Sequence, residues 1–229
     1  MTSIQNRVFI SGISALLIQA IAYAHNGRDF LLVQTAHIQE QGSVYSVSRQ
    51  DYVKKNHDEF EFKPALIYGA MDWLALEVHG HIEKESGESA TYESTAPAVH
   101  LSFTPRAHAL GFGLSAEYEF AHDDEEDVVE VSGITSFENE EWITTLTVDY
   151  EKASGEDGGY GYGAGVRRAM NSQLALGIEI KGTYSDSTEV LGAIYSDVND
   201  RLTINVGVGV GFNNDVDLAI RTALTWRFN

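Results

Sequence analysis

The chain has 229 residues, with 34 acidic and 15 basic side chains, a formal net charge of −19 and no cysteine. Such an acidic chain is not expected to bind nucleic acid, because neutralising phosphates requires an excess of lysine and arginine. The lack of cysteine excludes a disulfide framework and a lipid-attachment site.

Residues 1–24 are predicted to be a cleaved secretory signal peptide. Arg7 precedes a mostly apolar, uncharged stretch over residues 8–22, and residues 22–24 form a small-x-small cleavage site. The alternative is a transmembrane anchor, which is disfavoured because the stretch is short and is interrupted by Gln19.

Residues 25–41 form the next predicted segment, which precedes the regular strands. Its apolar residues between positions 30 and 38 fit a short amphipathic helix or an additional strand. The pattern does not choose between a periplasmic segment and a plug inside the structure that follows.

From residue 42 to residue 229 the chain reads as strands with period-two alternation, which gives each strand two unlike faces. The region 110–120 is typical, because Leu110, Phe112 and Leu114 oppose Gly111 and Gly113. Twelve strands are predicted, at residues 43–52, 59–69, 73–83, 92–104, 110–120, 127–137, 142–150, 158–168, 174–184, 188–197, 202–212 and 217–228.

The connections alternate in character. Acidic, glycine- and serine-rich connections follow odd-numbered strands, at residues 84–91, 122–126, 153–157, 185–187 and 213–215, except that residues 53–58 contain Lys54 and Lys55. Tighter turns such as 70–72 and 169–172 follow even-numbered strands. An even strand number with this alternation favours a single-chain barrel whose two ends lie in the periplasm and whose acidic loops face the cell exterior.

The predicted fold class is therefore all-β, a transmembrane antiparallel up-and-down barrel of about 12 strands. No segment after residue 24 has the ~20 consecutive apolar residues of a membrane helix, so insertion requires a closed barrel. Glycines with isolated charges suit a crowded barrel interior, where small residues make room for long polar ones. Aromatics near strand ends suit interfacial girdles. A soluble periplasmic β-sandwich, which also alternates, is the competing interpretation.

With these strands, a signal peptide and an aromatic final strand, the chain resembles bacterial outer-membrane β-barrel proteins over residues 25–229. The resemblance implies residence in the outer membrane of a Gram-negative bacterium, as a monomer in contact with lipids and lipopolysaccharide. It also implies recognition by the barrel-insertion machinery, which usually reads a terminal aromatic. Here Phe228 is penultimate and Asn229 is last, so this signal departs from the usual pattern.

The alternation also predicts which charged side chains line the lumen. They are Glu61, Lys63, Glu77, His79, His81, Glu117, Glu119, Asp149, Arg167, Glu179, Lys181, Arg221 and Arg227. Glu77, His79 and His81 share one strand face and are the only candidate metal ligands, although polar lumen lining is favoured over a metal site. The acidic run at residues 123–127 matches no standard calcium loop.

Three functions are consistent with this pattern. The leading hypothesis is a narrow, porin-like channel for small, preferentially cationic or neutral solutes. The alternatives are a plugged structural or surface-interaction barrel without transport, and a soluble periplasmic sandwich. No lipid-facing Ser–His pair is found, so no enzymatic activity and no cofactor are predicted.

Overall fold

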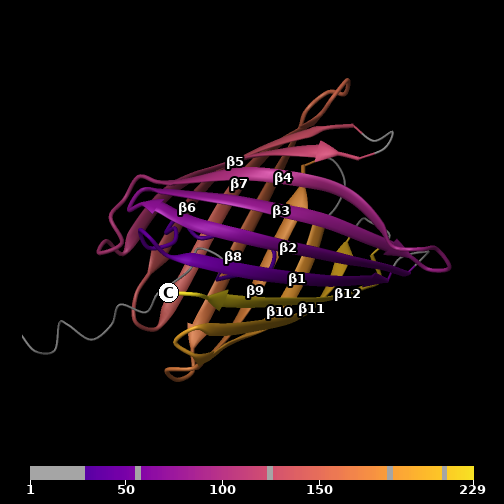
Figure 1. The fold of residues 1–229 in the computed structure, drawn as a ribbon. Coiled ribbons are helices and arrows are strands. Elements are labelled where there is room, and N and C mark those ends of the chain that lie inside the picture. The colour runs from indigo at the N-terminus through magenta and orange to yellow at the C-terminus, as the bar shows by residue number, and fades with distance from the viewer. Residues whose placement is uncertain (1–28, 55–57, 123–125, 185–187, 213–215) are drawn as a thin grey trace, which may run out of the picture.

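The alternating residues form twelve strands that a computed structural model closes into one barrel (Figure 1). The structure describes residues 29–54, 58–122, 126–184, 188–212 and 216–229, so the predicted signal peptide and most of the acidic run lie outside the described residues. The strands are β1 (Val44–Lys54), β2 (Asp58–Met71), β3 (Leu74–Glu85), β4 (Thr91–Ser102), β5 (Leu110–Ala121), β6 (Val128–Glu138), β7 (Trp142–Ala153), β8 (Gly159–Ala169), β9 (Leu174–Thr183), β10 (Thr188–Asn199), β11 (Leu202–Phe212) and β12 (Leu218–Arg227).

Each strand pairs antiparallel with its neighbour in sequence, and β12 pairs with β1 to close the ring. The closing register runs from Tyr45 opposite Arg227 to Lys54 opposite Leu218. The predicted twelve-stranded up-and-down barrel is confirmed, and the sandwich alternative is wrong because the closed sheet has no free edge. Among the described residues, no helix has the length and apolarity needed to cross a membrane.

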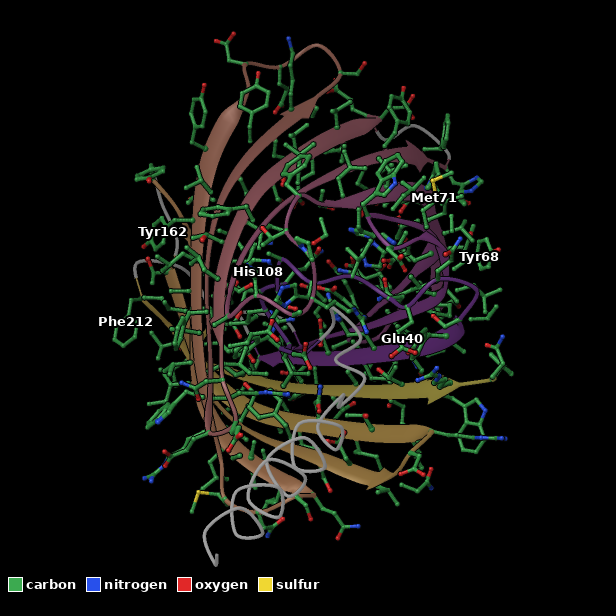
Figure 2. All side chains as sticks on the ribbon, turned by 90° about the vertical axis from the view of Figure 1, so that its left-hand side faces the viewer. Glu40, Tyr68, Met71, His108, Tyr162 and Phe212 are labelled. Carbon is green, nitrogen blue, oxygen red and sulfur yellow. The ribbon has the colours of Figure 1, made fainter. Side chains whose placement is uncertain are left out.

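The outer face of the wall is apolar. Leu66, Val148 and Ile178 point outward and are each more than half exposed, as expected of side chains that contact lipid. Figure 2, which looks towards the end of the barrel that carries the C-terminus, shows Tyr68 and Phe212 outside the wall and Glu40 inside it. The alternation therefore separates an apolar exterior from a lumen lined by small and polar residues.

The two ends of the barrel differ. We call the end where β1 begins and β12 finishes the terminal rim (left in Figure 1), and the opposite end the loop rim. The connections at the terminal rim are mostly short, as predicted after even-numbered strands. The exception is the connection from β4 to β5, residues 103–109, whose Arg106 reaches into the lumen.

The last residue closes the seam between β12 and β1. Asn229 accepts a hydrogen bond from the backbone N–H of Val44 at 2.9 Å and donates one to the carbonyl of Gly42 at 2.9 Å. Phe228 still faces outward, as predicted, and is 54% exposed. The side chain of Asn229 thus continues the pairing between β12 and β1 by hydrogen bonds, which an aromatic side chain at this position would not form.

The core of the protein lies inside the barrel rather than within the wall. Residues 29–40, which we call the inner segment, run through the terminal half of the lumen without regular secondary structure. Phe30, Leu31 and Val33 are at most 4% exposed and pack against wall residues of β7, β10 and β12. Ile38 packs against β1, β2 and β3 in a second cluster.

Glycines of the wall provide the space for the inner segment. A Cβ added at Gly163 would lie 2.5 Å from Val33, one at Gly165 would lie 2.9 Å from Phe30, and one at Gly207 would lie 2.8 Å from Leu31. In the sequence interpretation, such glycines make room for long polar side chains. In the structure, these glycines make room for the inner segment instead. Neither the predicted amphipathic helix nor an added strand forms in residues 29–40.

Candidate functional site

The lumen is the candidate site, and the predicted charged residues all lie on its side of the wall. They come from β2 (Glu61, Lys63), β3 (Glu77, His79, His81), β5 (Glu117, Glu119), β7 (Asp149), β8 (Arg167), β9 (Glu179, Lys181) and β12 (Arg221, Arg227). They do not form one site. They divide between the loop half of the lumen and the contacts that hold the inner segment.

In the loop half, carboxylates occupy directly paired positions on neighbouring strands. We call these the acidic rows, and they are Glu117, Glu130 and Glu151 across β5, β6 and β7, and Asp51, Glu61 and Glu83 across β1, β2 and β3. Like charges directly opposite each other on adjacent strands destabilise a sheet. Because the carboxylates of both rows lie in this half of the lumen, the electrostatic potential is negative there.

Arg221 on β12 compensates the second acidic row. Its guanidinium donates to both oxygens of Glu189 at 2.9 and 2.7 Å and makes an ion pair with Asp51. The bidentate geometry fixes the Arg221 side chain against the wall. Lys63 pairs with Glu61, and Lys181 interacts electrostatically with Glu151. Cations thus hold the rows in place while carboxylates still outnumber them.

The two histidines considered as candidate metal ligands face different carboxylates. His79 lies between Glu77 and Glu117, with nitrogen–oxygen distances of 3.6 and 3.4 Å. His81 lies 3.6 Å from Glu61 and 3.9 Å from Glu119. In the part of the chain that the structure describes, no group of three or more His, Asp and Glu side chains is arranged to hold a metal ion. The geometry is that of an imidazole–carboxylate network.

His100 extends this network in a way that strand facing alone did not predict. Its Nε2 lies 2.9 Å from Glu77 and its Nδ1 lies 2.9 Å from the hydroxyl of Ser115. A Ser–His–Glu chain can activate a nucleophile, but catalysis also needs free donors for the oxyanion. Here the neighbouring backbone N–H groups belong to the barrel ladder, and the three residues are at most 7% exposed. The contacts of His100 link β3, β4 and β5.

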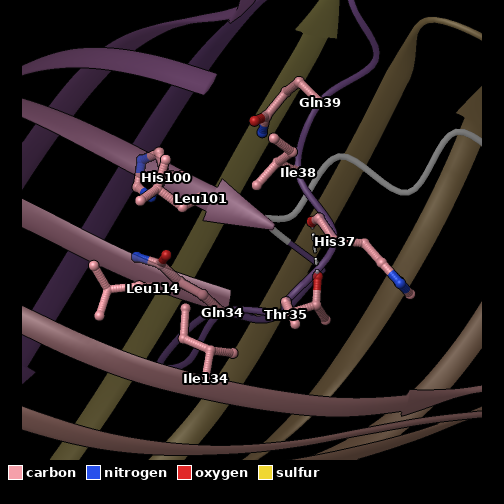
Figure 3. A pocket seen from close by; sticks show the side chains of 10 residues that line it. Gln34, Thr35, His37, Ile38, Gln39, His100, Leu101, Leu114 and Ile134 are labelled. Atoms are coloured by element: carbon pink, nitrogen blue, oxygen red, sulfur yellow. Dashed lines mark hydrogen bonds between the residues drawn. The ribbon is translucent and has the colours of Figure 1, made fainter. Parts of the chain in front are cut away.

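Residues 34–39 of the inner segment cover this link. A cavity of about 10 Å³ lies between them and His100, Leu101, Leu114 and Ile134 (Figure 3). That volume is about the size of one water molecule. The terminal half of the lumen is therefore filled where the segment approaches β4, β5 and β6.

Glu179 on β9 anchors the inner segment. It is fully buried, and its carboxylate accepts hydrogen bonds from the backbone N–H groups of Leu31, Leu32 and Val33, the shortest at 2.9, 2.6 and 3.3 Å. The hydroxyl of Tyr195 donates a fourth bond at 2.7 Å. Successive N–H groups that converge on one anion form a backbone nest, here closed by a side chain of the wall.

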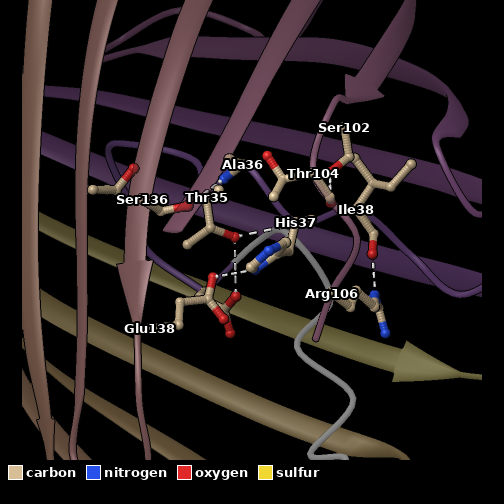
Figure 4. Close-up of polar contacts among 12 residues, drawn as sticks. Thr35, Ala36, His37, Ile38, Ser102, Thr104, Arg106, Ser136 and Glu138 are labelled. Atoms are coloured by element: carbon tan, nitrogen blue, oxygen red, sulfur yellow. Dashed lines mark hydrogen bonds and ion pairs between the residues drawn. The ribbon is translucent and has the colours of Figure 1, made fainter. Parts of the chain in front are cut away.

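Other wall residues hold the segment along its length. Thr145 donates to the carbonyl of Gln34 at 2.6 Å, and Ser136 accepts from the N–H of Ala36 at 2.8 Å. Figure 4 shows the contacts nearer the rim, where His37 pairs with Glu138 at 2.9 Å and Arg106 donates to the carbonyl of Ile38.

The first described residue of the segment and its last are held by arginines. Arg167 makes an ion pair with Asp29 at 3.1 Å and stacks over the ring of Tyr195. Arg227 pairs with Glu40 at 2.7 Å, and Arg106 pairs with the other oxygen of Glu40 at 3.3 Å. Two of the predicted lumen arginines thus bind the inner segment instead of lining an open path.

No family model matches the chain, and no curated protein sequence matches it significantly. Its structure is similar to that of an outer membrane channel from Pseudomonas putida F1, with a TM-score of 0.65 and 12% identity over 84% of this chain and 98% of that chain. The KdgM porin gives 0.62 and 8% identity over 81% and 99%, and Omp33 of Acinetobacter baumannii gives 0.53 and 13% over 82% and 99%. The chain has the fold of a bacterial outer-membrane β-barrel.

The lumen of this barrel has an open part at the terminal rim. A cavity of about 910 Å³ is bounded by the segment residues His37 and Glu40 and by wall residues that include Trp142, Arg167 and Tyr195. The cavity therefore leads from the terminal rim to the inner segment. The barrel thus has three consecutive zones, namely this vestibule, the inner segment and the acidic rows.

Proposed function

We propose that the chain is an outer-membrane channel that passes small solutes and favours cationic or neutral ones. The observation that supports this most directly is the pair of acidic rows in the loop half of the lumen. A cleft with walls of low dielectric constant and one predominant sign of charge raises the local concentration of counter-ions. Rings of acidic side chains are a common device for cation selectivity.

The inner segment sets the size of the passage. Because it fills the terminal half between the vestibule and the rows, conduction through the resting barrel is expected to be low. The fold is shared with proteins described as channels and porins, which supports transport as the role. For the orientation we propose that the terminal rim faces the periplasm and the acidic loops face outward, where divalent cations can link them to lipopolysaccharide.

The test is the reversal potential of the purified protein in planar bilayers under a potassium chloride gradient. We expect small, cation-selective conductance whose selectivity weakens as salt screens the rows. Replacing Glu130 and Glu151 by glutamine should reduce the selectivity, whereas Glu88→Gln on an exposed loop should change it less, because water screens that charge. Absence of conductance, or a preference for chloride, would contradict the proposal.

A second candidate is a plugged barrel without transport, which the tight fit of the inner segment favours. The two candidates differ in the wild-type chain, because a channel conducts with the segment in place, whereas a barrel plugged by the segment conducts only after the segment is released from Glu179. Cell fractionation and heat-modifiable migration in detergent gels test the proposed export and outer-membrane location. Neither measurement depends on the solute.

A further inference from the structure

Between Leu31 and Ala36, the hydrogen bonds from the wall go to the backbone of the inner segment. Glu179 accepts from three consecutive N–H groups, Thr145 donates to the carbonyl of Gln34, and Ser136 accepts from the N–H of Ala36. Backbone N–H and carbonyl groups occur at the same spacing in any peptide. Contacts of this kind therefore recognise a backbone that follows the same bent course, with little dependence on its side chains, as in other modes of peptide recognition.

The side chains of the segment occupy apolar gaps of moderate size. Gly163, Gly165 and Gly207 leave room opposite Val33, Phe30 and Leu31, and the ring of Tyr195 meets that of Phe30 edge to face at 5.8 Å. These gaps are formed by small residues and aliphatic neighbours, so they accept apolar side chains of different shapes. A charged side chain at these positions would be buried without a partner, at high cost.

We propose that this part of the lumen is a binding site for short peptides that take the same bent course and carry apolar side chains at the positions of residues 30–33, and that residues 29–38 are its resident ligand. The inference rests on the proposed channel and names its solute class. The vestibule of about 910 Å³ adjoins the site on one side. On the other side, the acidic rows attract the free amino group of an incoming peptide.

The resident ligand has the advantage of covalent attachment. Only residues 39–43 separate it from β1, and a short tether gives an effective concentration in the millimolar range. A peptide in solution therefore competes at millimolar concentration, or at lower concentration when the segment is weakened. This property makes the proposal testable in the full-length chain.

The experiment is isothermal titration calorimetry on the full-length variant Phe30→Ser, Leu31→Ser in detergent micelles. The probe is the acetylated, amidated peptide with the sequence of residues 29–39. We expect binding at least about tenfold tighter than to the wild-type chain, where the site is occupied. A peptide in which only the four apolar residues 30–33 are scrambled among themselves should bind within about tenfold of the probe, because the backbone and the apolar character of the gaps are the same. Maltoheptaose should not bind.

The decisive control is the probe peptide with N-methyl groups at the positions of Leu31, Leu32 and Val33. It keeps every side chain but lacks the donors that Glu179 accepts, so its binding should be lost. Equal binding of the methylated peptide, or no binding of the scrambled one, would overturn backbone recognition.

A second measurement covers the case in which the variant does not fold. The chain has no cysteine, so Thr35→Cys introduces a single buried thiol in the segment. Adding the probe peptide should accelerate its labelling by a thiol reagent, while the methylated peptide should not. An unchanged rate with both peptides would refute the proposal. Neither assay requires conductance, so the two proposals can fail independently. A barrel that conducts but binds no peptide contradicts only this inference, and a barrel that binds the peptide but does not conduct contradicts only the proposed channel.

Discussion

Replacing Glu179 by glutamine should release the inner segment while leaving the barrel closed. The carboxylate accepts bonds from Leu31, Leu32, Val33 and Tyr195, and an amide turns one acceptor oxygen into a donor group that faces donors. One of the two oxygens is lost as an acceptor and the remaining bonds lose their charged acceptor, which together cost about 1–3 kcal/mol. A cost of about 2 kcal/mol multiplies the population of the released segment about thirtyfold.

The assay is the labelling rate of a cysteine placed at Thr35, which is 3% exposed. If labelling requires release of the segment, the rate should rise about thirtyfold in the Glu179→Gln background. Asp149→Asn is the matched control. Asp149 is also a buried carboxylate on the lumen side, but it does not belong to the anchor of the segment. An unchanged rate in folded Glu179→Gln protein would refute the reasoning that Glu179 is the anchor.

Three further predictions concern the wall. Gly165→Val should displace the inner segment and raise conductance, because a Cβ at this position would lie 2.9 Å from the ring of Phe30. Gly192→Val should not, because its Cβ would lie 4.0 Å from its nearest neighbour. Asn229→Ala removes two hydrogen bonds across the seam and should lower the free energy of unfolding by about 1–3 kcal/mol, measured by urea titration in micelles. Arg221→Leu leaves buried Asp51 without its ion-pair partner and should cost about 3–5 kcal/mol in the same assay; a loss below 1 kcal/mol would contradict the role given to this arginine.

The barrel could be predicted because its pattern is local. In β11, valines and glycines alternate without interruption, so the two faces are visible in the sequence itself. The inward position of Glu179 or Arg221 follows from the same counting. Pairing was harder to predict, because it depends on register. The irregularity between His81 and Ile82 shifts β4 relative to β3, and strand facing alone does not show that His100 meets Glu77.

The inner segment could not be predicted because its structure is not local. Phe30, Leu31 and Val33 have no periodicity that separates helix from strand, and their backbone groups are satisfied by side chains of distant strands. The signal that could have identified it is the coincidence of glycines on the lumen side of β5, β8 and β11, at Gly113, Gly163 and Gly207. Glycines at lumen-facing positions of the wall indicate that another part of the chain packs against them inside the barrel.

The two layers of this protein are held by different bonds, and they should therefore open separately. The wall is a continuous ladder of backbone pairs, so exposing its amides requires opening the whole ring. The inner segment is held by side chains such as Glu179 and Thr145, so it can leave as a local event. Native-state hydrogen exchange should accordingly show two rate classes, with the N–H groups of Leu31 to Val33 exchanging long before those of the strands that surround them.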